Sequence, residues 1–232
     1  MRVDIISFTK RGAELSLRLA GEFGEEARLF MKGGSAERSG ISKVEEDLRE
    51  WTGKRFREHI PLIFIGALGI AVRSVAPFVE DKLKDIPVVV IDEAGKYAIP
   101  VLSSHYGGAL HIAERCARAL GAVCVKTTAT DINEVFAVDV FAAKNNLIPA
   151  NREGIKGISS KLLNGEKVKM YFEGVIVRGS LPDGVEITDS KITADIVVSN
   201  RTPTRSCILQ LVPPNLHLGV GCKKNKSCEE IL

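Results

Sequence analysis

The sequence lacks the patterns that define the commonest cofactor, metal and hydrolase sites. Its five cysteines are scattered and form no Cys-x-x-Cys pair, which predicts reduced thiols rather than a disulfide or zinc framework. The dinucleotide fingerprint Gly-x-Gly-x-x-Gly and the phosphate loop ending in Gly-Lys-Ser/Thr are missing. The nucleophile elbow Gly-x-Ser-x-Gly is missing too. These absences argue against a standard nucleotide site and against a serine hydrolase.

Long apolar runs and blocks of like charge are also missing. The longest apolar run, 62–72, is too short to cross a bilayer, and the first ten residues are too polar and too short for a secretion signal. The formal net charge is +3, with acids and bases interspersed and no basic arm. We therefore expect a cytoplasmic protein with neither a membrane nor a nucleic-acid partner.

Hydrophobic periodicity indicates strands that alternate with helices in the first part of the chain. Apolar runs predict strands over 3–8, 27–31, 62–67, 87–92, 97–102 and 122–126. Helical spacing predicts helices over 12–23, 43–51, 69–79 and 107–120. Such alternation is typical of an α/β fold whose mostly parallel sheet is covered on both faces, in three layers.

The pattern changes near residue 133, where we place a domain boundary. Helices are predicted over 134–145 and 152–163, and short strands over 167–172, 175–177, 195–199 and 208–212, with glycine turns between them. The sequence thus predicts an α/β domain over 1–133 and a smaller α+β domain over 134–212. Residues 213–232 are interpreted as a linker followed by either the truncated start of a further domain or a segment that packs elsewhere.

Four polar clusters each follow a predicted strand. They are GALGIAVR (66–73), DEAGKY (92–97), LSSHYGGA (102–109) and TTATDINE (127–134). Ligands of parallel α/β sheets bind at the carboxyl ends of the strands. We therefore expect Gly66, Asp92, Ser103 and Thr127 to converge at one edge of the sheet.

Each cluster also has a purely structural interpretation. Asp92 and Glu93 fit a tight turn or hairpin as well as an acid/base role. Ser104 fits a helix N-cap as well as an anion contact, and Asp131 fits an N-cap in a capping box. The histidine in the third cluster, His105, favours function, because imidazole moves protons near neutral pH.

Together, the stretches GALGIAVR…APF, VVVIDEAGKYAIPVLSSHYGGA and TTATDIN resemble the N-terminal domain of the cobalamin-biosynthesis protein G (CbiG) family. AVDVFAAKNNL…LLNGEKV resembles its middle domain, and VPPNLHLGVGCKK the opening of its C-terminal domain. The resemblance implies a cobalt-precorrin-5A hydrolase of anaerobic cobalamin synthesis. Water would open a δ-lactone on the macrocycle, and a two-carbon unit would leave as acetaldehyde.

For this reaction we assign roles by chemistry. His105 is the expected general base, kept neutral by a helix N-terminus and oriented by Glu93 or Asp92. Glycine N–H groups, hydroxyls and cations are the expected contacts of a flat, carboxylate-fringed macrocycle. The expected substrate-binding residues are Gly66, Gly69, Arg73, Lys96, Ser103, Ser104, Gly107, Gly108, Lys126, Thr127 and Thr128.

No cofactor or metal site of the protein's own is expected, because the cobalt belongs to the substrate. The expected partners are the cobalt-precorrin, other enzymes of the cobalamin pathway, and a second copy of the chain in a homodimer. Two other functions stay open at this point. One is a non-catalytic carrier or scaffold for tetrapyrrole intermediates, which acetaldehyde release would separate from an enzyme. The other is a nucleotide-binding α/β protein, which a thermal shift with nucleotides would test.

Overall fold

The computed structural model describes residues 2–33, 40–81, 84–177, 182–201 and 207–214. The segment 213–232, interpreted from the sequence as a linker and a further segment, lies mostly outside these residues. The chain divides into two compact units, Met1–Val140 and Phe141–Leu232. The two sheets are separate, because the strand that contains Ile5 and the strand that contains Ile196 belong to different sheets.

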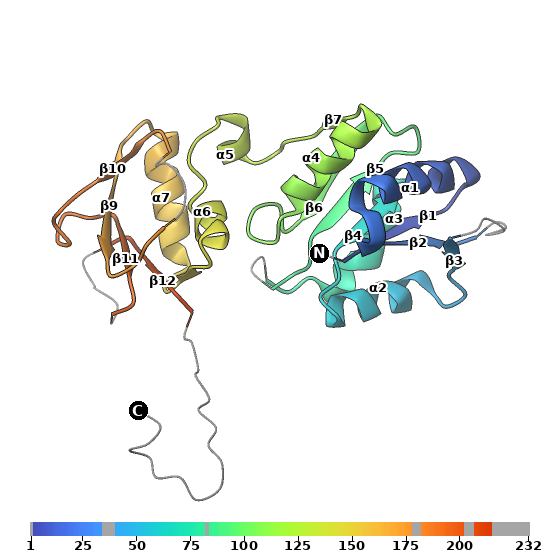
Figure 1. The fold of residues 1–232 in the computed structure, drawn as a ribbon, viewed down its shortest axis with the longest axis horizontal. Helices are drawn as coiled ribbons and strands as arrows, with labels where there is room; N and C mark the ends of the chain where they lie inside the picture. The colour runs from blue at the N-terminus through green and yellow to red at the C-terminus, as the bar shows by residue number, and fades with distance from the viewer. Residues whose placement is uncertain (1, 34–39, 82–83, 178–181, 202–206, 215–232) are drawn as a thin grey trace, which may run out of the picture. The chain divides into compact units, whose positions relative to one another are not determined.

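The first unit is built on a seven-stranded sheet in the order β3-β2-β1-β4-β5-β6-β7 (Figure 1). Six of the expected strands match it in position, and β3 was not predicted. The strands are β1 (Val3–Ser7), β2 (Ala27–Met31), β3 (Ile41–Lys43), β4 (Leu62–Ile65), β5 (Val88–Ile91), β6 (Tyr97–Leu102) and β7 (Val123–Cys124).

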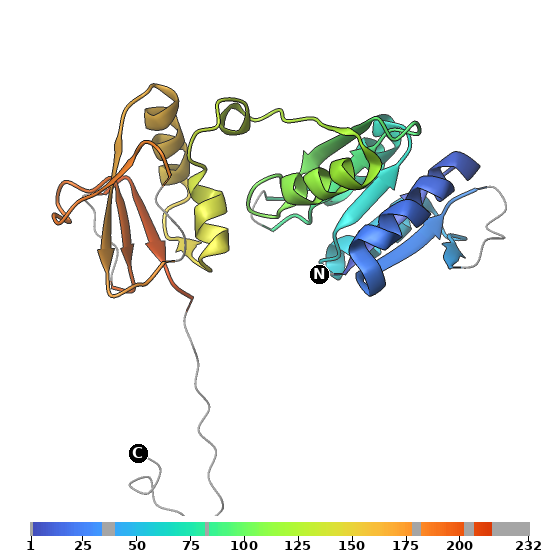
Figure 2. The ribbon, with the colours of Figure 1, turned by 45° about the horizontal axis from the view of Figure 1, so that its top comes forward.

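Helices cover both faces of this sheet. The covering helices are α1 (Lys10–Phe23), α2 (Leu48–Arg57), α3 (Leu68–Val75) and α4 (Ala109–Leu120), with 3₁₀ turns η1 (Gly24–Glu26) and η2 (Ala76–Phe78). The short helix α5 (Ala129–Ile132) has no buried residue. One core joins α1 and α4 to alternate strand residues such as Ile5 and Ile63. A second core, on the other face, joins α2 and α3 to the strand residues Ile6 and Phe64, which follow Ile5 and Ile63 in sequence. Figure 2 shows α1 and α4 side by side on one face.

Strand direction changes once within the described part of the sheet. Strands β1 to β5 are parallel to their neighbours, β6 is antiparallel to β5, and β7 is parallel to β6. The β5–β6 turn makes the two strands a hairpin. As a result β6 and β7 end at the edge where β1, β4 and β5 begin. We call this the amino edge of the sheet and the opposite one the carboxyl edge.

The second unit has a five-stranded sheet in the order β10-β9-β11-β12-β8. Its strands are β8 (Ile148–Pro149), β9 (Val168–Glu173), β10 (Val185–Ile187), β11 (Ile196–Ser199) and β12 (Leu209–Val212). Its main helix is α7 (Glu153–Leu163), and α6 (Val138–Lys144) contains the unit boundary. The strands are parallel except for β8, which is antiparallel to β12.

The predicted fold class, an α/β domain followed by a smaller domain, is confirmed. The small sheet is more parallel than expected, since only β8 runs against its neighbour. The strand expected over 175–177 is not formed, and β8 and β10 were not predicted. The helix expected over 43–51 begins five residues later, at Leu48, because Asp47 caps its first turn through Arg49 N at 2.8 Å. No helix in the described part of the chain is long and apolar enough to cross a membrane.

Candidate functional site at the amino edge of the first sheet

The loop between β6 and α4, residues 103–108, is held tightly against the amino edge. Ser103 adopts a left-handed conformation with φ 55°, and its hydroxyl donates to the backbone oxygen of Asp85 at 2.7 Å. A Cβ on Gly107 would lie only 2.5 Å from Ser103 Cβ, so only glycine fits there. Strained, tightly packed loops of this kind concentrate at functional sites.

His105 in this loop lies between two carboxylates. Its Nε2 lies 2.9 Å from both Asp131 oxygens, and its Nδ1 lies 3.4 Å from Asp139 Oδ2. The Thr128 hydroxyl is 3.3 Å from Nε2 and also donates to Asp131. The side chains of His105 and Asp131 are each only 12% exposed. The arrangement is therefore a half-buried acid–base cluster made from three separate segments of the first unit.

The two carboxylates control the charge of the ring. The hydrogen bond with Asp139 raises the pKa of His105 most, and Asp131 adds to it, while burial acts in the opposite direction. The outcome is a pKa of about 9, against an ordinary value of 6.5. At neutral pH His105 is thus an imidazolium. The expectation of a neutral base oriented by Asp92 or Glu93 is wrong for the described structure, because neither of these acids faces the ring.

The expected convergence of four strand ends at one edge is wrong. Gly66 and Asp92 follow β4 and β5 at the carboxyl edge, whereas Ser103 and Thr128 follow β6 and β7 at the amino edge. The physical reason is the β5–β6 hairpin, which reverses the chain between Asp92 and Ser103. The structure groups Ser103, Ser104, His105, Gly107, Gly108, Thr127 and Thr128 at the amino edge.

The other predicted residues lie elsewhere. Gly69 lies in the first turn of α3, and the Arg73 guanidinium lies over it on the exposed face of that helix. Glu93 and Lys96 are exposed in the β5–β6 turn, and Lys126 is exposed, 3.7 Å from Glu114. These positions belong to the surface or to the carboxyl edge, and no contact joins them to His105.

Asp92 organises the β5–β6 turn. Its carboxylate accepts backbone N–H groups of Ala94, Lys96 and Tyr97 at 3.0, 2.7 and 2.6 Å. This is the turn interpretation that the residue pattern DEAGKY left open. All three hydrogen bonds are local, so the aspartate is committed to shaping the hairpin.

Sequence reasoning missed the role of the two acids that bind His105. Asp131 was interpreted as an N-cap, but Thr128 is the N-cap residue of α5 and Asp131 lies within the helix. The sequence gives only a weak signal for Asp139, an acid between the apolar Val138 and Val140 in the middle of the helix predicted over 134–145. Only the fold brings both acids to the histidine.

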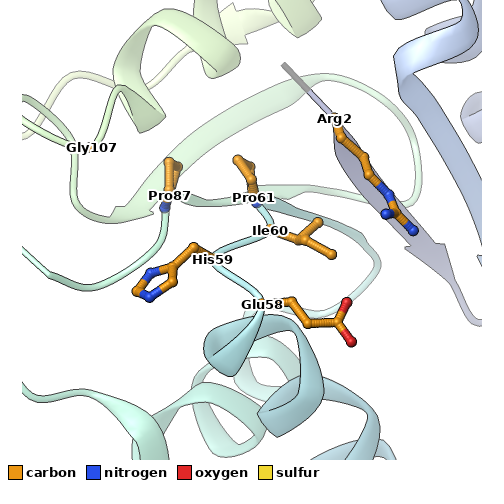
Figure 3. A pocket seen from close by; sticks show the side chains of 7 residues that line it. All are labelled: Arg2, Glu58, His59, Ile60, Pro61, Pro87 and Gly107. Carbon is orange, nitrogen blue, oxygen red and sulfur yellow. The ribbon is translucent and has the colours of Figure 1, made fainter. Parts of the chain in front are cut away.

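A pocket with a volume of about 580 Å³ opens at the same edge. Figure 3 shows its apolar part, Ile60, Pro61 and Pro87, with Arg2 and Glu58 on one side and His59 on the other. Gly107 lines it from the loop that carries His105. Within the described residues, no group of three or more His, Cys, Asp or Glu side chains is arranged to hold a metal ion.

The fold and this cluster define a two-unit α/β protein with a half-buried acid–base site beside a pocket. Residues 50–131 match the family description "Cobalamin synthesis G N-terminal", and residues 136–213 match "Cobalamin biosynthesis central region". The chain therefore belongs to the cobalamin-biosynthesis protein G family and carries its N-terminal and central regions. This confirms the resemblance found in the sequence.

Two similar proteins are named cobalt-precorrin-5A hydrolase. The one from Salmonella typhimurium is 36% identical over 182 residues, which is 73% of this chain and 52% of that protein. The one from Priestia megaterium is 29% identical over 251 residues, which is 98% of this chain and 66% of that protein. The chain thus spans between half and two thirds of the length of these relatives.

A crystal structure of a cobalamin biosynthesis protein G homolog from Sulfolobus solfataricus is also similar. It matches with a TM-score of 0.49 and 21% sequence identity. The match covers 91% of this chain and 60% of that one.

Proposed function

We propose that this chain acts as a cobalt-precorrin-5A hydrolase, opening the δ-lactone of the cobalt-corrinoid intermediate and releasing acetaldehyde. The observation that carries the proposal is the 36% identity to a relative of that name, over 73% of this chain. That match agrees with the two family regions that together extend from residue 50 to 213. The acid–base cluster around His105 supports it, because lactone hydrolysis requires proton transfers to and from oxygen.

The cluster supports a specific division of roles. Attack of water on the lactone carbonyl releases a proton, and cleavage of the ring C–O bond leaves an oxygen that needs one. His105 is protonated at neutral pH, so it is suited to give a proton to that leaving oxygen. Asp139, the more distant partner at 3.4 Å, takes the proton of the attacking water. Direct transfer from Asp139 to Nδ1 then restores both groups. Acetaldehyde leaves in a second step, in which the new hydroxyl loses its proton, its carbon–carbon bond to the macrocycle breaks, and the electron pair of that bond stays with the macrocycle.

Asp131 is the positioning residue in this proposal. It holds Nε2 at 2.9 Å and leaves Nδ1 as the side of the ring that exchanges protons. The glycine-rich loop 103–108 supplies the rigid support. We further propose that the chain needs no cofactor besides the cobalt carried by its substrate. Binding of other pathway enzymes and of a second copy of the chain stays a prediction.

The test is acetaldehyde release by the purified chain, incubated without oxygen with cobalt-precorrin-5A and no added cofactor. The Salmonella relative, assayed in parallel, checks the quality of the substrate. We expect catalytic turnover, and a roughly 10²–10⁴-fold loss in His105→Asn, the usual magnitude of positioned proton transfer. Stoichiometric binding without acetaldehyde, beside an active relative, would instead support a carrier. Near-normal release by His105→Asn would show that His105 only packs the loop.

A further inference from the structure

The pocket at the amino edge contains polar side chains that form no direct hydrogen bond or ion pair within the described residues. Among the described residues, Arg2, Glu58 and His59 have no ion-pair partner and no side-chain hydrogen bond, and all three are exposed. Asp4, a buried aspartate in β1, in contrast forms ion pairs with Arg28 at 2.6 Å and with Arg55 at 2.9 Å. The rim of the pocket is thus polar and open to a ligand.

The floor of the pocket is apolar and rigid. Ile60 is 5% exposed, and Pro61 and Pro87 are buried where the chain enters β4 and β5. Both segments are fixed by backbone hydrogen bonds, from Asp4 N to Pro61 O at 3.0 Å and from Leu62 N to Pro87 O at 2.9 Å. An apolar floor with a few polar groups at the rim is the usual form of a small-molecule site.

His59 occupies a backbone position where glycine is more stable. It follows the end of α2 with φ 53°, and the turn is closed by His59 N to Phe56 O and Ile60 N to Arg55 O. Helices commonly end with glycine in this left-handed conformation, because any Cβ is strained there. The histidine side chain has no partner within the described residues that would offset this strain. A ligand contact in the pocket would do so.

We propose that this pocket binds carboxylate side chains of the cobalt-precorrin macrocycle. Arg2 and His59, on opposite sides of the apolar floor, donate hydrogen bonds to separate carboxylates, while the adjoining apolar edge of the macrocycle lies on Ile60, Pro61 and Pro87 (Figure 3). This inference rests on the proposed function for the identity of the ligand. It places the binding residues at the amino edge, on the same side as His105, and away from the carboxyl edge where Gly66 and Arg73 lie.

Two observations connect the pocket to the acid–base cluster. Gly107 lines the pocket and belongs to the six-residue loop that carries His105. The loop is also closed on itself by the bonds from Gly108 N to His105 O and from Ala109 N to Ser103 O, at 3.1 Å each. A ligand bound in the pocket is therefore in contact with a loop whose geometry also sets the position of the ring.

The Glu58 carboxylate allows a test of the charge of the ligand. It lies on the same rim and repels an anionic ligand, so Glu58→Gln should tighten binding while Arg2→Ala weakens it. A cationic or neutral ligand would not give this pair of opposite effects. Arg118, an exposed arginine in the last turn of α4 at the other edge, is the matched control for loss of one positive charge.

The probe is cobalt uroporphyrin III, a cobalt tetrapyrrole with carboxylate side chains, titrated by absorbance against the unsubstituted chain and each variant. We expect Arg2→Ala to raise Kd about tenfold, as for the loss of a charge-assisted hydrogen bond. Glu58→Gln should lower Kd, and Arg118→Ala should leave it unchanged. In the acetaldehyde assay, Arg2→Ala should raise KM with little change in kcat, because it binds substrate without taking part in proton transfer.

His59→Gly separates ligand binding from stability. Relief of the left-handed strain should raise the melting temperature, while loss of the imidazole should weaken probe binding. The inference is overturned if Arg2→Ala and His59→Gly bind the probe like the unsubstituted chain, or if Glu58→Gln binds it more weakly. Probe binding is measured without turnover. Failure of the hydrolase proposal therefore appears as missing acetaldehyde, and failure of this inference as an unchanged Kd.

Discussion

Replacing the acids around His105 should lower its pKa and remove a pH-dependent part of the stability. The ring has a pKa of about 9 in the folded chain, against an ordinary value of 6.5. Since each pKa unit corresponds to ~1.36 kcal/mol, the interactions of the charged ring favour folding by about 3 kcal/mol. A histidine whose pKa is raised by folding contributes this stability fully below pH 6.5. The contribution is lost as the pH rises through about 9.

The direct assay is a histidine NMR titration of the unsubstituted chain, Asp131→Asn and Asp139→Asn. Each substitution removes a carboxylate that favours the charged ring, so the pKa of His105 should fall. The double variant should fall below 6.5, because burial then acts alone and favours the neutral ring. Asp183→Asn, on the exposed surface of the second unit, is the control. A His111→Gln sample identifies the signals of the exposed ring on α4.

Urea unfolding at several pH values gives an independent measurement. The free energy of unfolding should be larger for the unsubstituted chain than for His105→Gln at pH 6.5. This difference should shrink by about 3 kcal/mol between pH 6.5 and pH 9. A margin that stays constant over this range, or a His105 signal that titrates near 6.5 in the unsubstituted chain, would refute the reasoning. Either result would mean that the two carboxylates do not hold the ring in its charged form.

Two further substitutions test the loop and the hairpin. Gly107→Ala places a Cβ 2.5 Å from Ser103 Cβ and should cost about 1–3 kcal/mol in urea unfolding, whereas Gly21→Ala in α1, where no atom lies within 4 Å, should be neutral or stabilising. A stable Gly107→Ala would mean that the loop is not tightly packed. Asp92→Ala should lower the melting temperature because three N–H groups lose their acceptor, while Asp92→Asn, which keeps an oxygen acceptor, should lose less. Both should keep turnover, and an inactive but stable Asp92→Asn would restore the catalytic role first expected for this residue.

Local pattern predicted most of the elements because each depends on neighbours in sequence. Strands β2 and β6 have the bounds predicted from the sequence, 27–31 and 97–102, since apolar runs between turn residues are strong strand signals. The short strands β3 and β10 were missed, because three residues carry too little pattern and pair only when a neighbouring strand is present.

The site was predictable in part. The LSSHYGGA loop and His105 were identified from their own residues, since a histidine and two glycines between a strand and a helix are unusual. The charge of the ring was not predictable, because it depends on acids that lie 26 and 34 positions further along the sequence and approach only in the folded chain. A sequence pattern has no information about such distances unless the topology is known.

The sequence by itself determined the α/β class, the family, most strands and helices, and the loop that carries the histidine, because these follow from residue type and short-range spacing. The tertiary structure decided which residues share an edge. One hairpin, turned by Asp92, places Ser103 and His105 opposite Gly66 and Asp92. Strand direction is a long-range property, fixed by pairing across the sheet. The same folding step brought two distant carboxylates to one imidazole and so made His105 a cation.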